Sequence, residues 1–140
     1  MALIADSGGI YGLYDASEKI HKAIRAAFDA EPGLAIIPMP VLSEIDYLLR
    51  NRLGIQAELD FIDDIRAGAF TLEPCLPEDL ARCAALIEAY RDLELGLADA
   101  CVIACAERLG ILRILTVDLR HFRVVRTARG KPLVLLPADA

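Results

Sequence analysis

The 140-residue sequence contains no tryptophan, only two histidines and few aromatic residues, which make up 6% of the chain. It also lacks a long apolar run. The longest uncharged stretch, residues 32–43, is interrupted by Pro38 and Pro40 and is far shorter than the roughly 20 residues of a membrane-spanning helix. The chain does not open with a basic segment followed by an apolar one, and Asp6 comes too early for a secretion signal. The sequence therefore predicts a cytoplasmic protein without a membrane span.

The chain has four cysteines but no Cys-x-x-Cys pair, and no histidine lies near a cysteine at the spacing of zinc ligands. Two of the cysteines are four residues apart in a stretch with helical periodicity. This pattern favours buried, reduced thiols that pack as small hydrophobic residues over a metal site or a disulfide. The four are Cys75, Cys83, Cys101 and Cys105.

Hydrophobic residues are abundant at 56% of the chain, and charged residues make up 26%. This composition excludes a disordered tail or a fibre, and the length is typical of one domain, which we expect to span residues 1–140. Short apolar runs alternate with longer segments of helical periodicity, which predicts an α/β protein. Its central parallel sheet, of about five strands, should be covered by helices on both faces. Strands are expected in residues 2–5, 34–37, 70–76, 111–117 and 133–136, and helices in residues 17–30, 40–53, 55–67, 77–90 and 97–109, with a further helix starting after residues 6–9.

Four of the 21 acidic residues do not read as ordinary surface charges. Asp6 and Asp118 directly end two predicted strands, and Glu44 and Asp99 lie in the first turns of two predicted helices. Each has a simple structural alternative: a helix N-cap for Asp6 and Asp99, a favourable interaction with the helix dipole for Glu44, and a turn for Asp118. Asp99 carries the strongest signal, because it is the only charge in residues 95–106, a segment that is apolar on nearly all sides.

Taken together, the four acids point to a shared site. The carboxyl ends of parallel strands, and the helices that follow them, meet at one edge of a sheet, where ligands bind in folds of this type. Four carboxylates gathered there would repel one another unless a cation neutralised them. Oxygen ligands favour Mg²⁺ or Mn²⁺, and such ions activate water for the hydrolysis of phosphodiesters. The pattern therefore predicts a nuclease.

Four short segments carry a resemblance that covers essentially the whole chain. They read Ile-Ala-Asp-Ser-Gly at residues 4–8, Pro-Val-Leu-Ser-Glu-Ile at residues 40–45, Leu-Gly-Leu-Ala-Asp-Ala at residues 95–100 and Leu-Thr-Val-Asp-Leu-Arg-His-Phe at residues 115–122. In this order and spacing, the chain resembles the PIN domain family and, within it, the VapC-type toxins of bacterial toxin–antitoxin pairs. The resemblance implies a PIN-like three-layer α/β/α fold and a metal-dependent endoribonuclease with Mg²⁺ or Mn²⁺ as cofactor.

The resemblance also implies partners and roles for particular residues. The partners would be an RNA substrate, a small cognate antitoxin and a second copy of the chain in a homodimer. Apolar faces of the helices in residues 41–53 and 55–67 are the expected docking surfaces. The family's four acids, which would be both catalytic and metal-binding, correspond to Asp6, Glu44, Asp99 and Asp118, and its accessory polar positions to Ser7 and Thr116.

Charge is unevenly distributed along the chain. The net charge is zero over residues 1–28, −11 over residues 29–107 and +5 over residues 108–140. We expect the basic segment to hold RNA phosphates beside the acidic site, although a solvated surface would explain the same charges. The residues chiefly expected to bind RNA are Arg113, Arg120, Arg123, Arg126 and Arg129.

Two other functions are alternatives to the nuclease. A phosphatase that resembles the haloacid dehalogenase family would need a second acid two residues after Asp6, where this chain has Gly8. A PIN-like module that binds RNA or a partner without catalysis would not need a complete set of acids. His121 follows the fourth acid closely, but the sequence shows no arrangement resembling a catalytic dyad around it.

Overall fold

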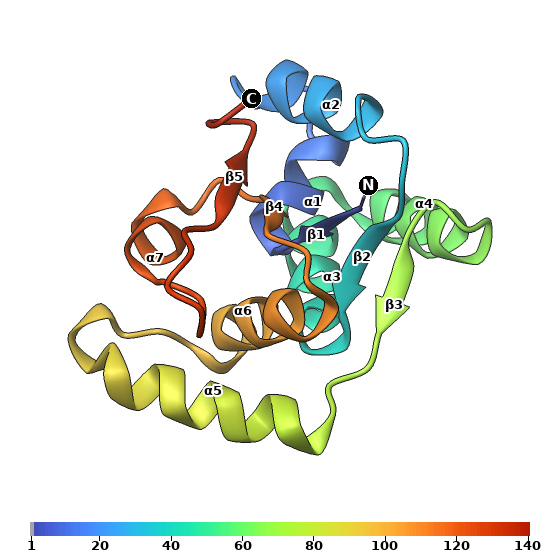
Figure 1. Ribbon diagram of the computed structural model, residues 1–140. Helices are drawn as coiled ribbons and strands as arrows, with labels where there is room; N and C mark the ends of the chain where they lie inside the picture. Colours follow the sequence, from blue (N-terminus) through green and yellow to red (C-terminus); the bar gives the residue numbers. More distant parts are fainter. Residues whose placement is uncertain (1) are drawn as a thin grey trace.

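The computed structural model describes residues 2–140 and contains one five-stranded sheet in the order β3-β2-β1-β4-β5 (Figure 1). All neighbouring strands are parallel, so the predicted α/β fold with a central parallel sheet is confirmed. The sheet takes strands from both ends of the chain. The strands are β1 (Leu3–Ala5), β2 (Ala35–Pro38), β3 (Thr71–Glu73), β4 (Arg113–Leu115) and β5 (Val134–Leu136).

Seven α-helices connect or flank these strands in residues 2–140. Six of them correspond to the expected helical segments, including the one that begins after Asp6, whereas α7 was not predicted. In this region no helix is both long and apolar enough to cross a membrane. The helices are α1 (Ser7–Tyr14), α2 (His21–Asp29), α3 (Met39–Leu53), α4 (Ile55–Arg66), α5 (Pro77–Ala89), α6 (Leu97–Leu109) and α7 (Leu119–Val124), with a short 3₁₀ turn, η1 (Arg91–Leu93), before α6.

The strands stay parallel, but the side of β1 on which successive strands are added reverses once. From β1 the chain moves outward to β2 and β3, then returns through α5 and α6 to place β4 on the other side of β1. Figure 1 shows α2 on one side of the strands and α6 with α5 on the other, which gives the three layers. In open parallel sheets the carboxyl edge at such a reversal is the usual ligand site. Here it lies between β1 and β4.

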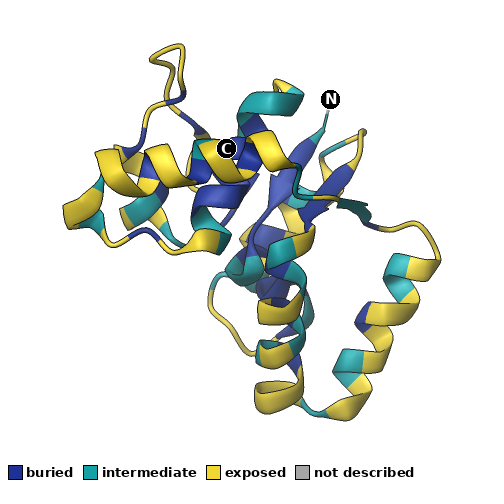
Figure 2. Ribbon diagram, turned by 90° about the horizontal axis from the view of Figure 1, so that it is seen from below, coloured by how far each residue is buried: buried dark blue, intermediate teal, exposed yellow. Residues whose placement is uncertain are grey.

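Burial explains why the sequence reads as continuous apolar runs. All three residues of β1 and all four of β2 are buried, because helices cover both faces of the sheet. Residues 100–106 of α6 are buried without interruption, since α6 packs on β1 and β2 on one side and on α5 on the other. Figure 2 shows this division, with buried strands and exposed outer helix faces. The all-round apolar character of α6 therefore reflects its central position.

The helices α3 and α4 form a hairpin that extends away from the strands (Figure 2). Phe61 of α4 is buried and packs edge-on against Tyr14, with ring centroids 5.8 Å apart, and also against Phe70. Beyond this contact much of the hairpin is exposed, including the large apolar side chains of Tyr47 and Ile55. The hairpin is thus anchored near the sheet and leaves apolar surface open along its length.

Candidate active site

Asp6 leaves β1 at the reversal point and is the N-cap of α1. One carboxylate oxygen accepts a hydrogen bond from the backbone N–H of Gly9 at 2.8 Å, and the other accepts one from the hydroxyl of Thr116 at 2.5 Å. The N-cap alternative considered from the sequence is therefore correct, and it coexists with a place in the site. Gly9 permits the close packing, because a Cβ there would lie 2.2 Å from the carbonyl oxygen of Leu115 in β4.

The Asp6 carboxyl is only 5% exposed, and its ionisation is disfavoured. Burial raises the pKa of Asp6 from 3.8 to about 7, and the nearby charges of Asp99 and Asp118 also raise it. The hydrogen bonds from Thr116 and Gly9 act in the opposite direction. A positive charge placed near Asp6 would favour the ionised carboxylate, which burial disfavours.

Thr116 connects the ends of β1 and β4. Its hydroxyl donates to Asp6 and accepts a hydrogen bond of 2.9 Å from the backbone N–H of Asp118. Thr116, which the resemblance gave only as an accessory polar position, is thus in direct contact with two of the predicted acids. Thr116 therefore fixes the position of one predicted acid relative to another.

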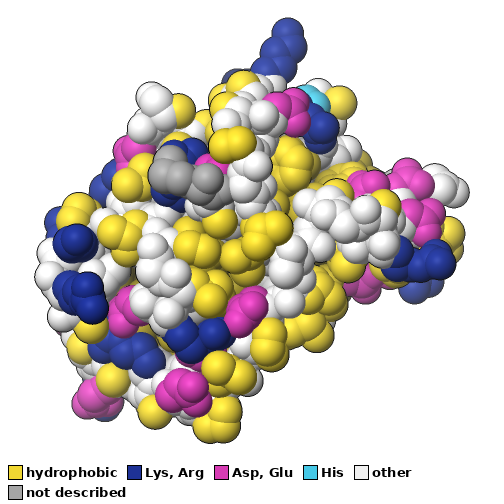
Figure 3. Space-filling view, turned by 45° about the vertical axis from the view of Figure 1, so that its right-hand side comes forward, with side chains coloured by type: hydrophobic (Ala, Val, Ile, Leu, Met, Phe, Trp, Pro, Cys, Tyr) yellow, Lys and Arg dark blue, Asp and Glu magenta, His cyan; other side chains and the backbone are white. Residues whose placement is uncertain are grey.

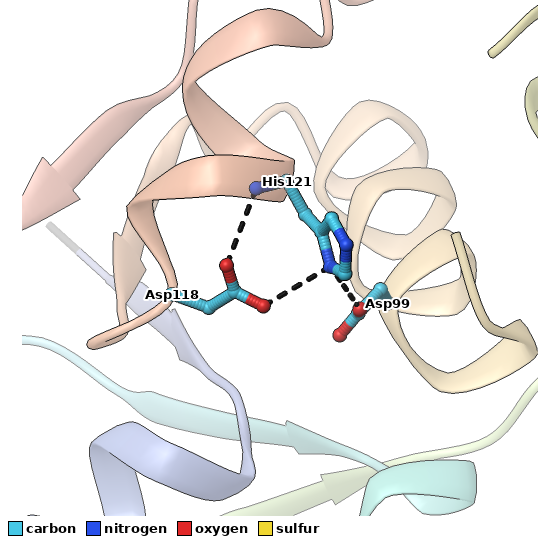
Figure 4. A group of neighbouring side chains, drawn as sticks. All are labelled: Asp99, Asp118 and His121. Carbon is cyan, nitrogen blue, oxygen red and sulfur yellow. Dashed lines mark hydrogen bonds and ion pairs between the residues drawn. The ribbon is translucent and has the colours of Figure 1, made fainter. Parts of the chain in front are cut away.

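Asp99, Asp118 and His121 form a compact cluster at the same edge (Figure 4). The Nδ1 atom of His121 lies 2.9 Å from a carboxylate oxygen of Asp99 and 3.0 Å from one of Asp118. Asp118 is the N-cap of α7, and its other oxygen accepts a bond of 3.2 Å from the backbone N–H of His121. Nδ1 is the one ring atom that contacts both carboxylates, so a hydrogen carried on Nδ1 would be shared between the two acids.

The three side chains come from two helices that meet at this edge. Asp99 lies in the first turn of α6, whose N-cap is Gly96, so the N-cap alternative for Asp99 is wrong. Burial raises the pKa of Asp99, the hydrogen bond from His121 lowers it, and the charge of Asp118 raises it again. His121 thus supplies the only neighbouring donor among the described contacts of Asp99.

This cluster fits a divalent cation. One ligand atom from each of Asp99, Asp118 and His121 can be chosen so that all three lie within 4.8 Å of one another. Carboxylate oxygens suit Mg²⁺ and Mn²⁺, and an added imidazole nitrogen is a ligand type that transition metals accept. The Nδ1 atom of His121 contacts both carboxylates, so the three groups are already drawn together.

Glu44 is placed differently from the other three acids. It is an exposed residue of α3 and lines a shallow hollow with Ser7, Ser43, Tyr47 and Leu48. Within residues 2–140, no hydrogen bond or ion pair joins Glu44 to another predicted acid. The structure therefore brings three of the four acids into one network. Glu44 lies outside this network and shares a hollow with Ser7, the residue that follows Asp6.

Arg113 and Arg129 lie away from the edge of the sheet that carries the predicted acids. Arg113 begins β4, whereas Asp118 follows its carboxyl end, and the guanidinium of Arg113 lies 3.0 Å from a buried oxygen of Glu31. Arg129 lines a cavity of about 670 Å³ together with Gly110 and other residues near the amino end of β4. These two arginines are thus at the opposite edge of the sheet from the acids.

The other predicted RNA-binding arginines follow Asp118 directly. Arg120 is an exposed residue of α7. Arg123 makes two hydrogen bonds, of 2.8 and 2.9 Å, to the carboxylate of Asp139. Arg126 donates to the carbonyl oxygen of residue 123 at 2.9 Å. Of these three, Arg120 is nearest in sequence to the acids and has no partner among the described hydrogen bonds and ion pairs.

The sequence interpretation missed the role of His121. His121 was set aside because no partner was visible near it, yet it contacts two of the predicted acids. One signal was present: a residue three positions after a helix-capping aspartate returns its backbone N–H to that cap. The second contact, with Asp99, joins residues 22 positions apart and requires the packing of α6 beside α7.

Comparison with known proteins agrees with this architecture. Residues 4–127 match the PIN domain family. Ribonuclease VapC26 of Mycobacterium tuberculosis is 30% identical to this chain over 135 residues, which cover 96% of this chain and all of that one.

Two solved structures share the fold. The crystal structure of VapC20 of M. tuberculosis, described as a sarcin–ricin loop cleaving toxin, has a TM-score of 0.75 at 20% identity and covers 83% of this chain and 89% of that one. A toxin–antitoxin complex from Klebsiella pneumoniae has a TM-score of 0.67 at 20% identity and covers 88% of this chain and 92% of that one.

The parallel sheet, the acidic edge and the match over residues 4–127 define the class: the chain belongs to the PIN domain family. The full-length similarity to Ribonuclease VapC26 then identifies it as a VapC-type member. The resemblance drawn from the four short segments is thereby confirmed.

Proposed function

We propose that the chain is a metal-dependent endoribonuclease that acts as the toxin of a toxin–antitoxin pair. The observation that carries the proposal is the network of Asp6, Thr116, Asp118, His121 and Asp99 at the reversal point of the sheet. The similarity to a relative named as a ribonuclease supports the same activity. The shared fold with a toxin–antitoxin complex supports the biological setting.

Asp99 and Asp118 are the residues that would hold the cation most directly, and Asp6 would add a third negative charge behind them. Their oxygens suit Mg²⁺ or Mn²⁺. When bound, such an ion supplies Lewis acidity toward the phosphodiester and lowers the pKa of a bound water. His121 holds both carboxylates in place by its Nδ1–H, and Thr116 fixes the distance between Asp6 and Asp118.

Glu44 and Ser7 complete the proposed site from the side of α3. Both line the hollow beside the amino end of α1, where Glu44 can orient water or a substrate group. Glu44 is exposed and makes none of the described hydrogen bonds, so its replacement by glutamine should leave the fold intact. A loss of cleavage by Glu44→Gln without a loss of melting temperature would assign Glu44 to the active site.

The direct test compares RNA cleavage by the purified chain and by Asp99→Asn, with Mg²⁺ or Mn²⁺ and with a chelator. The asparagine variant keeps the shape of the side chain but removes its charge, so we expect almost no cleavage from a folded protein. The matched control is Asp92→Asn, because Asp92 is an exposed acid with no described partner. Cleavage that survives in folded Asp99→Asn, or that is unaffected by the chelator, would overturn the proposal. RNA binding without any cleavage would favour a non-catalytic module.

RNA binding is assigned first to Arg120, which follows Asp118 in α7, and then to Arg123 and Arg126, which come later in the chain. The body of the chain is strongly acidic, so local positive charge is needed to hold a polyanion there. Charge reversal at Arg123 and Arg126 should weaken RNA binding and flatten its salt dependence. An unchanged affinity and salt slope would make these arginines part of the solvated surface.

The exposed apolar side chains of the α3–α4 hairpin are the proposed docking surface for an antitoxin and for a second copy of the chain. Tyr47 is 67% exposed and Ile55 56%, and Leu59 and Ile62 of α4 are also exposed. Figure 3, which brings the α4 side of the molecule forward, shows apolar side chains spread between the charged ones on this face. Apolar surface of this kind is typical of interaction sites.

Co-expression with the small reading frame beside the gene tests the antitoxin partner. We expect the product of that frame to copurify with the chain and to suppress RNA cleavage. Light scattering of the purified chain tests the homodimer separately. A monomer at high concentration would exclude the homodimer without affecting the nuclease assignment.

A further inference from the structure

The four cysteines gather in one region, between α5, α6 and the segment that joins β3 to α5. The Sγ atoms of Cys75 and Cys101 lie 3.4 Å apart, although the two residues are 26 positions apart in the sequence. Cys83 and Cys101 are buried with Ala100 and Ala104 in a small cluster of their own, and Cys75 packs against it. The sequence favoured buried, reduced thiols that pack as small hydrophobic residues. All four are free, three of them are buried, and the sequence gave no sign of the contact between Cys75 and Cys101.

Ion pairs of Arg108 hold the segment around Cys75 against α6. Arg108 of α6 lies 2.9 Å from a carboxylate oxygen of Glu73 and 3.0 Å from one of Asp79. It also donates to the carbonyl oxygen of Pro74 at 3.3 Å. The contacts of Arg108 therefore fix the backbone on both sides of Cys75 to the helix that carries Cys101.

The two thiols differ in their access to solvent. Cys75 is partly exposed, whereas Cys101 is 1% exposed, and Cys83 and Cys105 are also buried. A small oxidant can therefore reach Cys75 first, and the sulfur next to it is that of Cys101. An accessible thiol beside a second thiol is the arrangement in which an oxidised cysteine is resolved as a disulfide.

We propose that Cys75 and Cys101 form an intramolecular disulfide when the chain meets a hydroperoxide. In the first step the Cys75 thiolate attacks the terminal peroxide oxygen, the O–O bond breaks, and Cys75 becomes a sulfenic acid. The oxygen that leaves takes up the proton that the Cys75 thiol had released, which gives an alcohol, or water where the oxidant is hydrogen peroxide. In the second step the sulfur of Cys101 attacks the sulfur of Cys75. The S–O bond breaks, and the hydroxide leaves as water with the proton of the Cys101 thiol. Two thiols thus lose two electrons, which reduce one hydroperoxide to an alcohol and water.

The bond would connect two parts of the chain that now interact only through non-covalent contacts. It closes a loop that contains all of α5, and it joins α6 two residues after Asp99. Closing a loop of this length restricts the unfolded chain and raises stability. The proposal does not depend on the nuclease function, because its readout is the covalent state of the thiols.

Peptide mapping of the full-length chain tests the proposal. The reduced protein is treated with hydrogen peroxide, the remaining thiols are alkylated after unfolding, and the protein is digested with trypsin. The cleavage sites separate the thiols well: Cys75 falls in residues 67–82, Cys83 in residues 83–91, and Cys101 with Cys105 in residues 92–108. We expect the intact mass to fall by two hydrogens, two of the four thiols to escape alkylation, and fragmentation to locate a link between Cys75 and Cys101.

Two variants make the assignment specific. Cys75→Ser should abolish the link and leave all three remaining thiols open to alkylation, whereas the link should persist in the control, Cys83→Ser. Oxidation should also raise the melting temperature of the unsubstituted chain by roughly 5–10 °C, and dithiothreitol should reverse this shift. A link through Cys83 or Cys105, a disulfide between two chains, or oxidation of Cys75 to a sulfinic acid without a link would overturn the proposal.

Discussion

Replacement of Asp6 by asparagine should stabilise the metal-free protein, and the gain should grow with pH. Below pH 3.8 the carboxyl is protonated in both the folded and the unfolded chain. Between 3.8 and about 7 the unfolded chain releases this proton while the folded chain retains it, so stability falls as the pH rises. The difference corresponds to at most about 4 kcal/mol of unfolding free energy above pH 7.

Asparagine cannot ionise, so it removes this pH-dependent loss of unfolding free energy while it keeps the contacts of the side chain. Its amide oxygen can still accept from the backbone N–H of Gly9, so the cap of α1 is retained. Its amide nitrogen can donate to the hydroxyl of Thr116, which can act as an acceptor. Of the pH-dependent cost, about 2–3 kcal/mol develops between pH 5 and pH 8. The stability advantage of Asp6→Asn over the unsubstituted chain should grow by that amount.

Urea unfolding in a chelator at pH 5 and pH 8 measures this difference. Thr116→Val is a control of opposite sign, because it removes a hydrogen bond that lowers the pKa of Asp6. This variant should lose stability, and should lose more at pH 8. Adding Mg²⁺ at pH 8 should stabilise the unsubstituted chain more than Asp6→Asn. An advantage of Asp6→Asn that is the same at both pH values would refute the reasoning.

Three further predictions follow from the site and its surroundings. His121→Ala should weaken Mg²⁺ binding in calorimetry, because His121 contacts both carboxylates and keeps them together; unchanged or tighter binding would show that His121 does not position them. Arg120→Gln should reduce the salt slope of RNA binding by up to about 0.7, the share of one phosphate contact. Arg113→Gln should leave the slope unchanged and lower the melting temperature, because it removes the ion-pair partner of the buried Glu31 carboxylate. Ile55→Lys should convert a dimer into a monomer in light scattering if α4 forms the interface, and a dimer that persists would exclude this face.

The strands could be predicted because parallel strands covered on both faces consist of short apolar runs. The residues of β1 and β2 are all buried, and both strands appear in the sequence as uninterrupted apolar segments. The edge strand β3 is only half-buried and ends before Pro74, so the expected strand in residues 70–76 was too long. The central strand β4 was also expected over too long a range, residues 111–117, although it spans Arg113–Leu115, whereas the edge strand β5 was placed to within one residue. Apolar patterning thus locates the strands of this sheet but not the residues at which each of them ends.

The helix α7 could not be predicted from periodicity. It has only six residues, and Phe122 is the only one of them that is buried. A helix of this length has fewer than two turns, which is too short for a recurring apolar face. Its start is encoded instead by the cap of Asp118, which the sequence interpretation had treated as a possible turn residue.

The acids of the site were predictable to different degrees. Asp6 directly follows β1, and Asp118 comes three residues after the end of β4, so the positions of these strands largely determine where the two acids lie. The position of Asp99 depends on how α6 packs, and its burial was inferred from the apolar residues around it. The contact between Asp99 and His121 depends on two helices that are distant in sequence, and no local pattern records it.

The strand order also explains why Glu44 stands apart from the other acids. At the carboxyl edge the strands that bear the site run in the order β2, β1 and β4. Asp118 follows β4, Asp6 follows β1, and Glu44 belongs to the helix that follows β2, so Asp6 lies between the other two. Because α6 returns the chain to β4, it delivers Asp99 to the side of Asp118, where α7 adds His121. The reversal in the sheet therefore concentrates the groups proposed to bind the cation on one side of Asp6 and leaves Glu44, with the hollow that it lines, on the other.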